Sequence, residues 1–275
     1  MTPASPPLDQ RSLLLRRQVV DSMIAAGRGH LGPAMSLMEI IRVLYDDILS
    51  VRPDQPLWPD RDRCILSKGH GVLALYALLA DKGFFPAADM AQFCRFDSYL
   101  GGHPQFGCTP GVDASTGALG HGLSIGVGMA LAARMQGRSS RVFVIMGDGE
   151  INEGTVWEAA MSASKHGLDR LVAMVDYNKQ QSYGPLEQVQ PLEPLADKWR
   201  SFGFAVSEVD GHDVAALRGV LQKLPLQTGK PSLILCHTVK GKGIPDAENN
   251  PQWHHKNKLS AEEQARVMAA IGGGL

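Results

Sequence analysis

The sequence predicts an α/β fold in which a doubly wound parallel sheet carries helices on both faces. Short apolar runs suited to buried strands alternate with stretches of helical character. Two of these runs, 142–146 and 171–175, are closed by Asp148 and Asn178, which are thirty residues apart. This spacing leaves room for one strand, one crossover helix and the next parallel strand. With 275 residues, of which 44% are hydrophobic, the chain is long enough for one large globular domain.

The N-terminal segment contains two helical patterns. Residues 10–26 form an amphipathic pattern, and Gly27 follows as a natural helix stop. Ser36 and Glu39 have the spacing of a capping box ahead of further apolar residues, so we expect Ser36 to begin a second helix. Three prolines within 50–62 predict a loop that leads into a short strand.

Beyond this loop, strands and helices alternate. The expected strands cover residues 64–66, 142–146, 171–175, 205–209 and 232–236. The expected helices cover residues 71–82, 118–136, 154–166, 194–201 and 213–223, with a short helix after residue 260. Residues 95–117 are rich in glycine and proline, and so long a connection inside a domain is usually functional. We expect a single domain over residues 1–275, with disordered tails at 1–9 and 272–275.

Composition indicates which classes of partner to expect. A formal net charge of −1 provides no basic field for nucleic acid or for an anionic membrane. Residues 1–10 lack the apolar core of a secretory signal, and no stretch reaches the roughly 18 apolar residues of a membrane span. The four cysteines show no Cys-x-x-Cys spacing, so we assign them no chemistry. A cytoplasmic enzyme that acts on small polar ligands is therefore expected.

Oxygen-bearing side chains close the two central apolar runs. Asp148, between Gly147 and Gly149, follows the first run, and Asn178 follows the second. The carboxyl ends of neighbouring parallel strands meet at one sheet edge, where ligands of open α/β sheets bind. A carboxylate and an amide oxygen suit a hard divalent cation that bridges to a diphosphate. The simpler alternative is an aspartate that only caps the following helix.

The Gly147-Asp148-Gly149 sequence, with Asn178 thirty residues on, resembles the thiamine diphosphate-binding motif. Five further stretches occur in the order and spacing of the N-terminal domain of transketolases: Gly29-His30, Leu66–His70, Gly101–Pro104, Ser115–Gly122 and Trp253–His255. The resemblance covers roughly residues 10–260 and is strongest to the subunit that carries this domain alone in split transketolases. It implies the thiamine diphosphate-binding fold of the PP type.

The resemblance also implies ligands for the cofactor and its metal ion. Asp148, the Asn178 side chain and the backbone carbonyl of Gln180 would bind Mg²⁺, or Ca²⁺ or Mn²⁺ in its place. The residues expected at the cofactor are His70, Gly117, Ala118, Leu119, Gly147, Asp148, Gly149, Glu153 and Asn178. Ala118 replaces a proline of the family, so this loop is expected to be less stiff. In the family, Glu153 would belong to a carboxylate network that crosses the subunit interface.

Three histidines, His30, His103 and His254, are implied to be catalytic and to line the substrate channel. Imidazole donates or accepts protons near neutral pH, which suits the proton transfers that accompany carbon–carbon bond cleavage and formation. His121 and His255 are left without a role.

Two basic positions have competing interpretations. Arg28 precedes the Gly29-His30 pair where a small polar residue is commoner, and it is either a cation at the end of a helix or an unusual contact to an anion. Lys240 lies in a Lys-Gly-Lys-Gly stretch that lacks P-loop spacing, and it belongs either near the cofactor entrance or on a solvated turn.

By the resemblance, the chain is a transferase of carbohydrate metabolism that moves a two-carbon ketol unit from a ketose donor to an aldose acceptor. In the family a second domain supplies the glutamate that activates the cofactor, and residues after 260 leave no room for one. We therefore expect a C-terminal partner subunit, in an α2β2 heterotetramer. Two alternatives remain: a subunit of the 2-oxo acid dehydrogenase or deoxyxylulose-phosphate synthase type, or a non-catalytic cofactor-binding scaffold. Whether the sugar carries phosphate, sulfonate or neither is left open.

Overall fold

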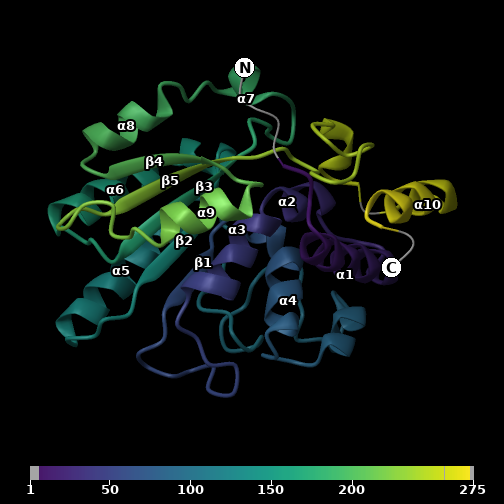
Figure 1. Ribbon diagram of the computed structural model, residues 1–275, viewed down its shortest axis with the longest axis horizontal. Coiled ribbons are helices and arrows are strands. Elements are labelled where there is room, and N and C mark those ends of the chain that lie inside the picture. The colour runs from purple at the N-terminus through teal and green to yellow at the C-terminus, as the bar shows by residue number, and fades with distance from the viewer. Residues whose placement is uncertain (1–5, 257, 273–275) are drawn as a thin grey trace.

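Five parallel strands form one sheet in the computed structural model, which describes residues 6–256 and 258–272 (Figure 1). The strands lie in the order β1-β2-β3-β5-β4. Their bounds are β1 (Arg63–Leu66), β2 (Val142–Gly147), β3 (Leu171–Tyr177), β4 (Ala205–Asp210) and β5 (Ser232–His237). Every residue of β2 and β3 is buried, as expected for parallel strands that are covered on both faces.

Successive residues along each strand face opposite helical layers. In β2, Phe143 packs into one hydrophobic cluster and Val144 into the other. The first layer consists of α1 (Gln10–Ala26), α2 (Leu31–Ser36), α3 (Met38–Val43), α4 (Val72–Asp81) and α9 (Val214–Leu221). The second consists of α5 (His121–Met135), α6 (Gly154–Lys165) and α8 (Leu195–Ser201) (Figure 1). The predicted α/β fold with helices on both faces of a parallel sheet is therefore confirmed.

Two short helices complete the layers. The helix α10 (Ala261–Ala270) is the one expected after residue 260, and its Val267 joins the first cluster. The single turn α7 (Leu186–Val189) was not predicted, and its Leu186 joins the second cluster.

Asp9, the last residue of the segment that was expected to be a tail, precedes α1 and is ordered by two contacts. The Oδ1 atom of Asp9 accepts a hydrogen bond from the backbone N–H of Ser12 at 2.9 Å and so caps the helix. The carboxylate of Asp9 also pairs with Arg42, at 2.5 Å. Residues 1–5 and 273–275 of the expected tails lie outside the described residues.

The prediction that Ser36 begins a helix is wrong. Ser36 is the last residue of α2, and its hydroxyl donates hydrogen bonds to the backbone carbonyl of Pro33 and to Asp176. Glu39 does not reach back to Ser36, because its buried carboxylate accepts hydrogen bonds from Arg16 at 2.5 and 2.9 Å. Leaving a buried charge without a partner costs more free energy than leaving a helix end without a side-chain cap. Glu39 therefore pairs with Arg16 and does not complete the capping box.

The small side chains of α5 allow the helix to lie close against the sheet. A Cβ atom on Gly126 would be 2.5 Å from Cγ2 of Val144 in β2. We expect Gly126→Ala to lower the free energy of unfolding by about 1–3 kcal/mol, because either the helix or the strand must move. Urea denaturation of the purified chain measures this change.

Gly128 provides the matched control on the same helix. No atom lies within 4 Å of a Cβ built there, so Gly128→Ala should leave stability unchanged or raise it by up to about 1 kcal/mol through helix propensity. Equal effects of the two substitutions on the free energy of unfolding would show that the packing of α5 on β2 does not restrict position 126 to glycine.

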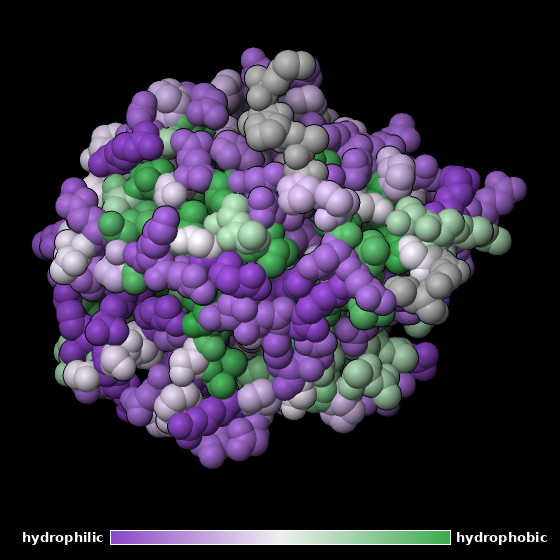
Figure 2. All heavy atoms as spheres, viewed as in Figure 1, coloured by the Kyte–Doolittle hydropathy of each residue, from purple (hydrophilic) through white to green (hydrophobic). Residues whose placement is uncertain are grey.

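None of the helices within residues 6–256 and 258–272 combines the length and the apolar character needed to cross a membrane. On the face shown in Figure 2, hydrophobic residues appear in small areas between hydrophilic ones.

Candidate functional site

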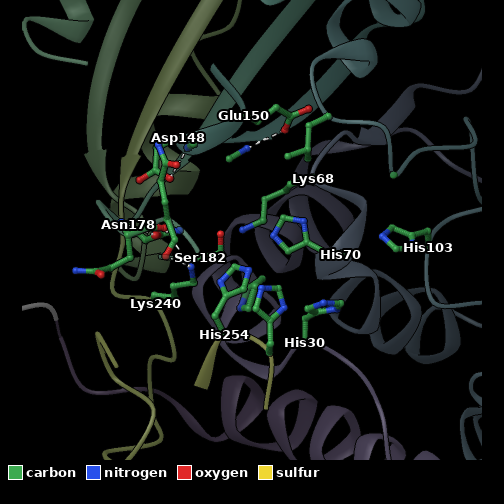
Figure 3. Close-up of a pocket in the computed structure, with 18 residues that line it drawn as sticks. His30, Lys68, His70, His103, Asp148, Glu150, Asn178, Ser182, Lys240 and His254 are labelled. Carbon is green, nitrogen blue, oxygen red and sulfur yellow. Dashed lines mark hydrogen bonds between the residues drawn. The ribbon is translucent and has the colours of Figure 1, made fainter. Parts of the chain in front are cut away.

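A cavity of about 360 Å³ opens at the carboxyl ends of the central strands. Most of the residues that the sequence nominated contribute to its wall (Figure 3). These are His30, His70, His103, Gly117, Leu119, Gly147, Asp148, Gly149, Asn178, Gln180 and His254. The structure therefore brings together segments that are separated by more than 200 residues in the chain.

Asp148 and Asn178 lie side by side because β2 and β3 are paired neighbours. Gly147 is in register with Asp176, so the residues that follow the two strands emerge at the same edge. Asp148 accepts hydrogen bonds from the backbone N–H groups of Gly149, at 2.8 Å, and Lys179, at 2.5 Å. The side-chain oxygen of Asn178 accepts one from the backbone N–H of Gln180, at 3.1 Å.

The carboxyl group of Asp148 is buried and forms no ion pair with any residue that the structure describes. Burial and the nearby charge of Asp176 raise its pKa to about 7, against the opposing effect of the two backbone hydrogen bonds. A carboxylate in this position is stabilised by a bound cation. The oxygens of Asp148, Asn178 and the Gln180 carbonyl form the all-oxygen ligand set that Mg²⁺ prefers, so these residues fit the predicted metal ion.

Two lysines provide positive charge beside these oxygens. Lys68 is buried and pairs with Asp176, which also accepts hydrogen bonds from Ser36 and Thr238. Lys240 is buried as well, and its ammonium group donates to the backbone carbonyl of Gln180 at 3.1 Å. Burial and the charge of Lys68 lower the pKa of Lys240 to about 8. Two desolvated ammonium groups next to an oxygen ligand set suit an anionic phosphate ligand.

The sequence left two interpretations of Lys240, a position near a cofactor entrance and a solvated turn. Lys240 is buried and lines the cavity, which excludes the solvated turn. Lys68 was not nominated from the sequence, although it lies in the Ser67–His70 turn that was. The side chains of Gln180 and His254 each present a buried polar atom with no hydrogen-bond partner among the described residues, Oε1 and Nδ1 respectively. Unpartnered polar atoms in a cavity wall are available to a polar ligand.

The histidines form a cluster at the other end of the cavity (Figure 3). The ring centroid of His70 is 5.7 Å from that of His30 and 5.8 Å from that of His254. His255 joins the cluster, with its ring 4.4 Å from His254. His103 lines the same cavity and lies to one side of these rings in the view of Figure 3.

Three rings of the cluster, those of His30, His70 and His254, are held in the neutral form. Burial and the charges of Lys240 and His255 lower the pKa of His254 to about 3. Burial, followed by the charge of Lys68, holds the pKa of His70 well below its usual value. The pKa of His30 is lowered as well, by burial and by neighbouring histidines. Neutral rings both donate and accept hydrogen bonds, which suits a ligand with several hydroxyl groups.

Two nominated residues lie outside this cavity. Ala118 faces a neighbouring surface pocket together with His121, while Gly117 and Leu119 on either side of it face the main cavity. Glu153 is exposed, precedes α6 and lies against Gly120 without lining the cavity.

Besides Asp148, a second carboxylate lies in the cavity wall, that of Glu150, which accepts hydrogen bonds from Ser67 and from the backbone N–H groups of Gly120 and Gly147. No sequence signal separates Glu150 from Glu153, because both follow Asp148 closely.

Comparison with known proteins identifies close relatives. Residues 10–273 match the family described as transketolase, thiamine diphosphate binding domain. The chain is 42% identical over 264 residues to the 6-deoxy-6-sulfo-D-fructose transketolase subunit of Clostridium sp. (strain MSTE9), covering 96% of each protein. It is 41% identical to one subunit of the apulose-4-phosphate transketolase of Phocaeicola vulgatus, over 90% of this chain and 88% of that protein.

Solved structures share the fold. Transketolase from Leishmania mexicana superposes with a TM-score of 0.86 at 30% sequence identity. The superposition covers 96% of this chain but 41% of the Leishmania protein. The chain thus matches most of the length of the two bacterial relatives and less than half the length of this transketolase.

Proposed function

This chain belongs to the family of transketolase thiamine diphosphate-binding domains, and we propose that it is the N-terminal subunit of a split transketolase. In this role it transfers a two-carbon ketol unit from a ketose donor to an aldose acceptor. The proposal depends mainly on one observation: an all-oxygen ligand set, two buried lysines and a cluster of neutral histidines line a single cavity. The first two features suit a metal-bound diphosphate, and the third suits a polyhydroxylated substrate.

The residues at the strand ends would hold the cofactor through Mg²⁺. Asp148, Asn178 and the backbone carbonyl of Gln180 supply oxygen ligands, and Lys68 and Lys240 neutralise the diphosphate. Thiamine diphosphate, when bound, supplies the carbanion chemistry that breaks and forms carbon–carbon bonds. A bound cation would favour the ionised form of Asp148, whose pKa is raised by burial, and Lys240, which donates to the Gln180 carbonyl, would lie beside the phosphate oxygens.

The histidine cluster would bind the sugar. His30, His103 and His254 line the cavity beyond the strand ends, and the lowered pKa values of His30 and His254 keep these two rings neutral at physiological pH. A neutral ring accepts a hydrogen bond from one sugar hydroxyl at its unprotonated nitrogen and donates one to another oxygen from its N–H group. Several histidines give a polyol more partners than a short 2-oxo acid would need, which favours the ketol transfer over the decarboxylating alternative.

The helices α5 and α6 present a surface that a partner would cover. They pack against each other, and both carry exposed methionines, Met135 and Met161. Glu153, the carboxylate expected at the subunit interface, is exposed beside them. Two relatives that this chain matches over most of their length are named as transketolase subunits, which supports a C-terminal partner with the pyrimidine-binding domain. An α2β2 assembly remains part of this proposal.

The names of the relatives suggest the class of sugar. One is named for a sulfonated ketose and the other for a phosphorylated one. We propose that this chain likewise acts on a sugar with an anionic group.

Reconstitution tests the proposed function. We expect no ketol transfer when this chain is mixed with thiamine diphosphate, Mg²⁺, a ketose donor and an aldose acceptor. Adding the C-terminal partner should produce turnover that is lost when the cofactor or Mg²⁺ is omitted. The assay measures the new ketose by chromatography, and the C-terminal partner by itself is the control.

Two results would contradict this expectation. Robust ketol transfer by this chain without a partner would remove the need for one. Release of carbon dioxide from a 2-oxo acid, without ketol transfer in any reconstituted pair, would favour the decarboxylating alternative.

A further inference from the structure

A second, smaller cavity adjoins the site. Its volume is about 290 Å³, and it shares His30, His70, His103 and His255 with the main cavity. The two spaces therefore meet at the histidine cluster. A sugar held by these histidines has room to extend into the side cavity, on the side away from Asp148 and Asn178.

The side cavity has a different chemical character from the main one. Its remaining wall includes the apolar side chains of Val72, Leu73 and Phe93, and one permanent cation, Arg28. No aspartate or glutamate lines it within residues 6–256 and 258–272, whereas Asp148 and Glu150 line the main cavity. A site with a cation, several imidazoles and no acid favours an anion.

The backbone fixes where Arg28 lies. Gly27 ends α1 with a φ of 63°, and Gly29 has a φ of 136°, so two glycines in conformations that other residues rarely adopt flank the arginine. A Cβ atom on Gly29 would also be 2.8 Å from Cδ1 of Leu73, so the side chain of Leu73 would have to move. This turn places Arg28 at the mouth of the side cavity.

The guanidinium group of Arg28 is exposed and makes no hydrogen bond or ion pair with the part of the chain that the structure describes. By contrast, Arg11, Arg16 and Arg42 in the same helical layer are all paired with carboxylates. Arg28 lines the side cavity together with Cys94. Its donors are available to a ligand, and the guanidinium fork matches a tetrahedral oxyanion.

We propose that the side cavity binds the charged end of the sugar substrate, a phosphate or a sulfonate, and that Arg28 is the residue that selects for this charge. The inference rests on the proposed ketol transfer and names the substrate class of the same site. Phosphate and sulfonate share the tetrahedral oxyanion that Arg28 would contact. His255, at the junction of the two cavities, is placed to donate a further hydrogen bond.

Binding tests this inference without turnover. Calorimetry measures the affinity of D-fructose 6-phosphate for the cofactor-free complex of this chain with its C-terminal partner. We expect Arg28→Ala to weaken binding by about 10- to 100-fold, the effect of losing one charge-assisted hydrogen-bonding group, and Arg28→Lys to restore part of it. Equal affinities of Arg28→Ala and the unaltered chain would overturn the proposal, as would no measurable binding by the unaltered chain. A failure of the ketol-transfer assay would leave this measurement valid.

Turnover by the loaded complex provides the second test. D-fructose, D-fructose 6-phosphate and 6-deoxy-6-sulfo-D-fructose share a carbon skeleton and differ at C6. In Arg28→Ala, the ratio of kcat/KM for each charged ketose to that for D-fructose should fall by about 10- to 100-fold, mainly through KM. If this ratio falls for only one of the charged ketoses, the site binds the anion of that ketose. If it falls equally for both, the site binds phosphate and sulfonate alike.

Arg95→Ala is the matched control. Arg95 is an exposed arginine next to Cys94 that does not line either cavity, so its loss removes the same charge nearby without removing the contact. We expect the ratios to be unchanged in this variant. Equal falls of the ratios in Arg28→Ala and Arg95→Ala would overturn the assignment of a direct contact. Such falls would arise from the loss of a positive charge near the site and not from the loss of a contact to the substrate.

Discussion

Replacing Asp148 by asparagine is expected to weaken Mg²⁺-dependent binding of thiamine diphosphate by about 100-fold or more. Changes in the surroundings of a metal ligand typically cost about 10- to 100-fold in metal affinity, and this substitution alters a proposed ligand itself. It removes the only negative charge of the proposed ligand set, formed by Asp148, Asn178 and the Gln180 carbonyl. Calorimetric titration of the chain with the cofactor at fixed Mg²⁺ measures the loss.

The same substitution should have little effect on the stability of the cofactor-free chain. Burial raises the pKa of Asp148 to about 7, so the ionised carboxylate already costs stability in the absence of a cation. Asp210→Asn is the matched control, because Asp210 ends β4 but lies outside the cavity. Unchanged cofactor affinity in Asp148→Asn, with the fold intact, would remove Asp148 from the ligand set.

Replacing Glu39 by alanine is expected to lower the free energy of unfolding by about 3–5 kcal/mol. The side chains of Arg16 and Glu39 are fully buried and joined by two hydrogen bonds. His212 donates to the same carboxylate through Nδ1 at 2.9 Å, because its Nε2 accepts from the backbone N–H of Val239. The substitution leaves the guanidinium of Arg16 buried without its counter-charge. Urea denaturation at neutral pH measures the change.

An exposed ion pair on α1 is the control that separates the effect of burial from the effect of losing one charge. Arg17 and Asp21 form an (i, i+4) pair on the surface of this helix, so Asp21→Ala should cost no more than about 0.5 kcal/mol. The double variant Arg16→Met, Glu39→Leu should recover much of the loss, because it removes both charges. Similar losses in Glu39→Ala and Asp21→Ala would contradict the importance of burial.

The same carboxylate should contribute to acid sensitivity. Burial alone would raise the pKa of Glu39, but the charge and hydrogen bonds of Arg16, together with His212, outweigh it and lower the pKa to about 2 from 4.5. A lowered carboxyl pKa stabilises the fold above the unfolded value, and this contribution is lost as the pH falls from about 4.5 toward 2. Glu39→Ala should therefore show a weaker dependence of stability on pH in this range.

The parts of the site that were predictable from residues alone are those fixed by sheet geometry. Asp148 and Asn178 follow apolar runs with the spacing of one crossover unit, so their common edge follows from the chirality and parallel pairing of such units. The convergence of His30, His70 and His254 has no such local signal, because each comes from a different loop. Only the resemblance to transketolases predicted that these three histidines would lie close together.

Residues whose role depends on tertiary partners were missed or misread. Lys68 and Glu150 are buried in the cavity wall through contacts to Asp176 and to backbone groups far along the chain, and no spacing reveals these contacts. The capping-box pattern of Ser36 and Glu39 failed for the same reason, since Glu39 binds an arginine from α1. A local pattern is reliable only where no buried charge competes for its side chains.

The most direct test of the proposed metal and cofactor site is a crystal structure of this chain grown with thiamine diphosphate and Mn²⁺, with anomalous scattering recorded to locate the metal. We expect one anomalous peak within about 2.0–2.3 Å of oxygens from Asp148, Asn178 and the Gln180 carbonyl, in contact with the diphosphate and beside Lys240. Cofactor bound elsewhere, or a cavity at β2 and β3 that holds neither metal nor diphosphate, would contradict the proposed function.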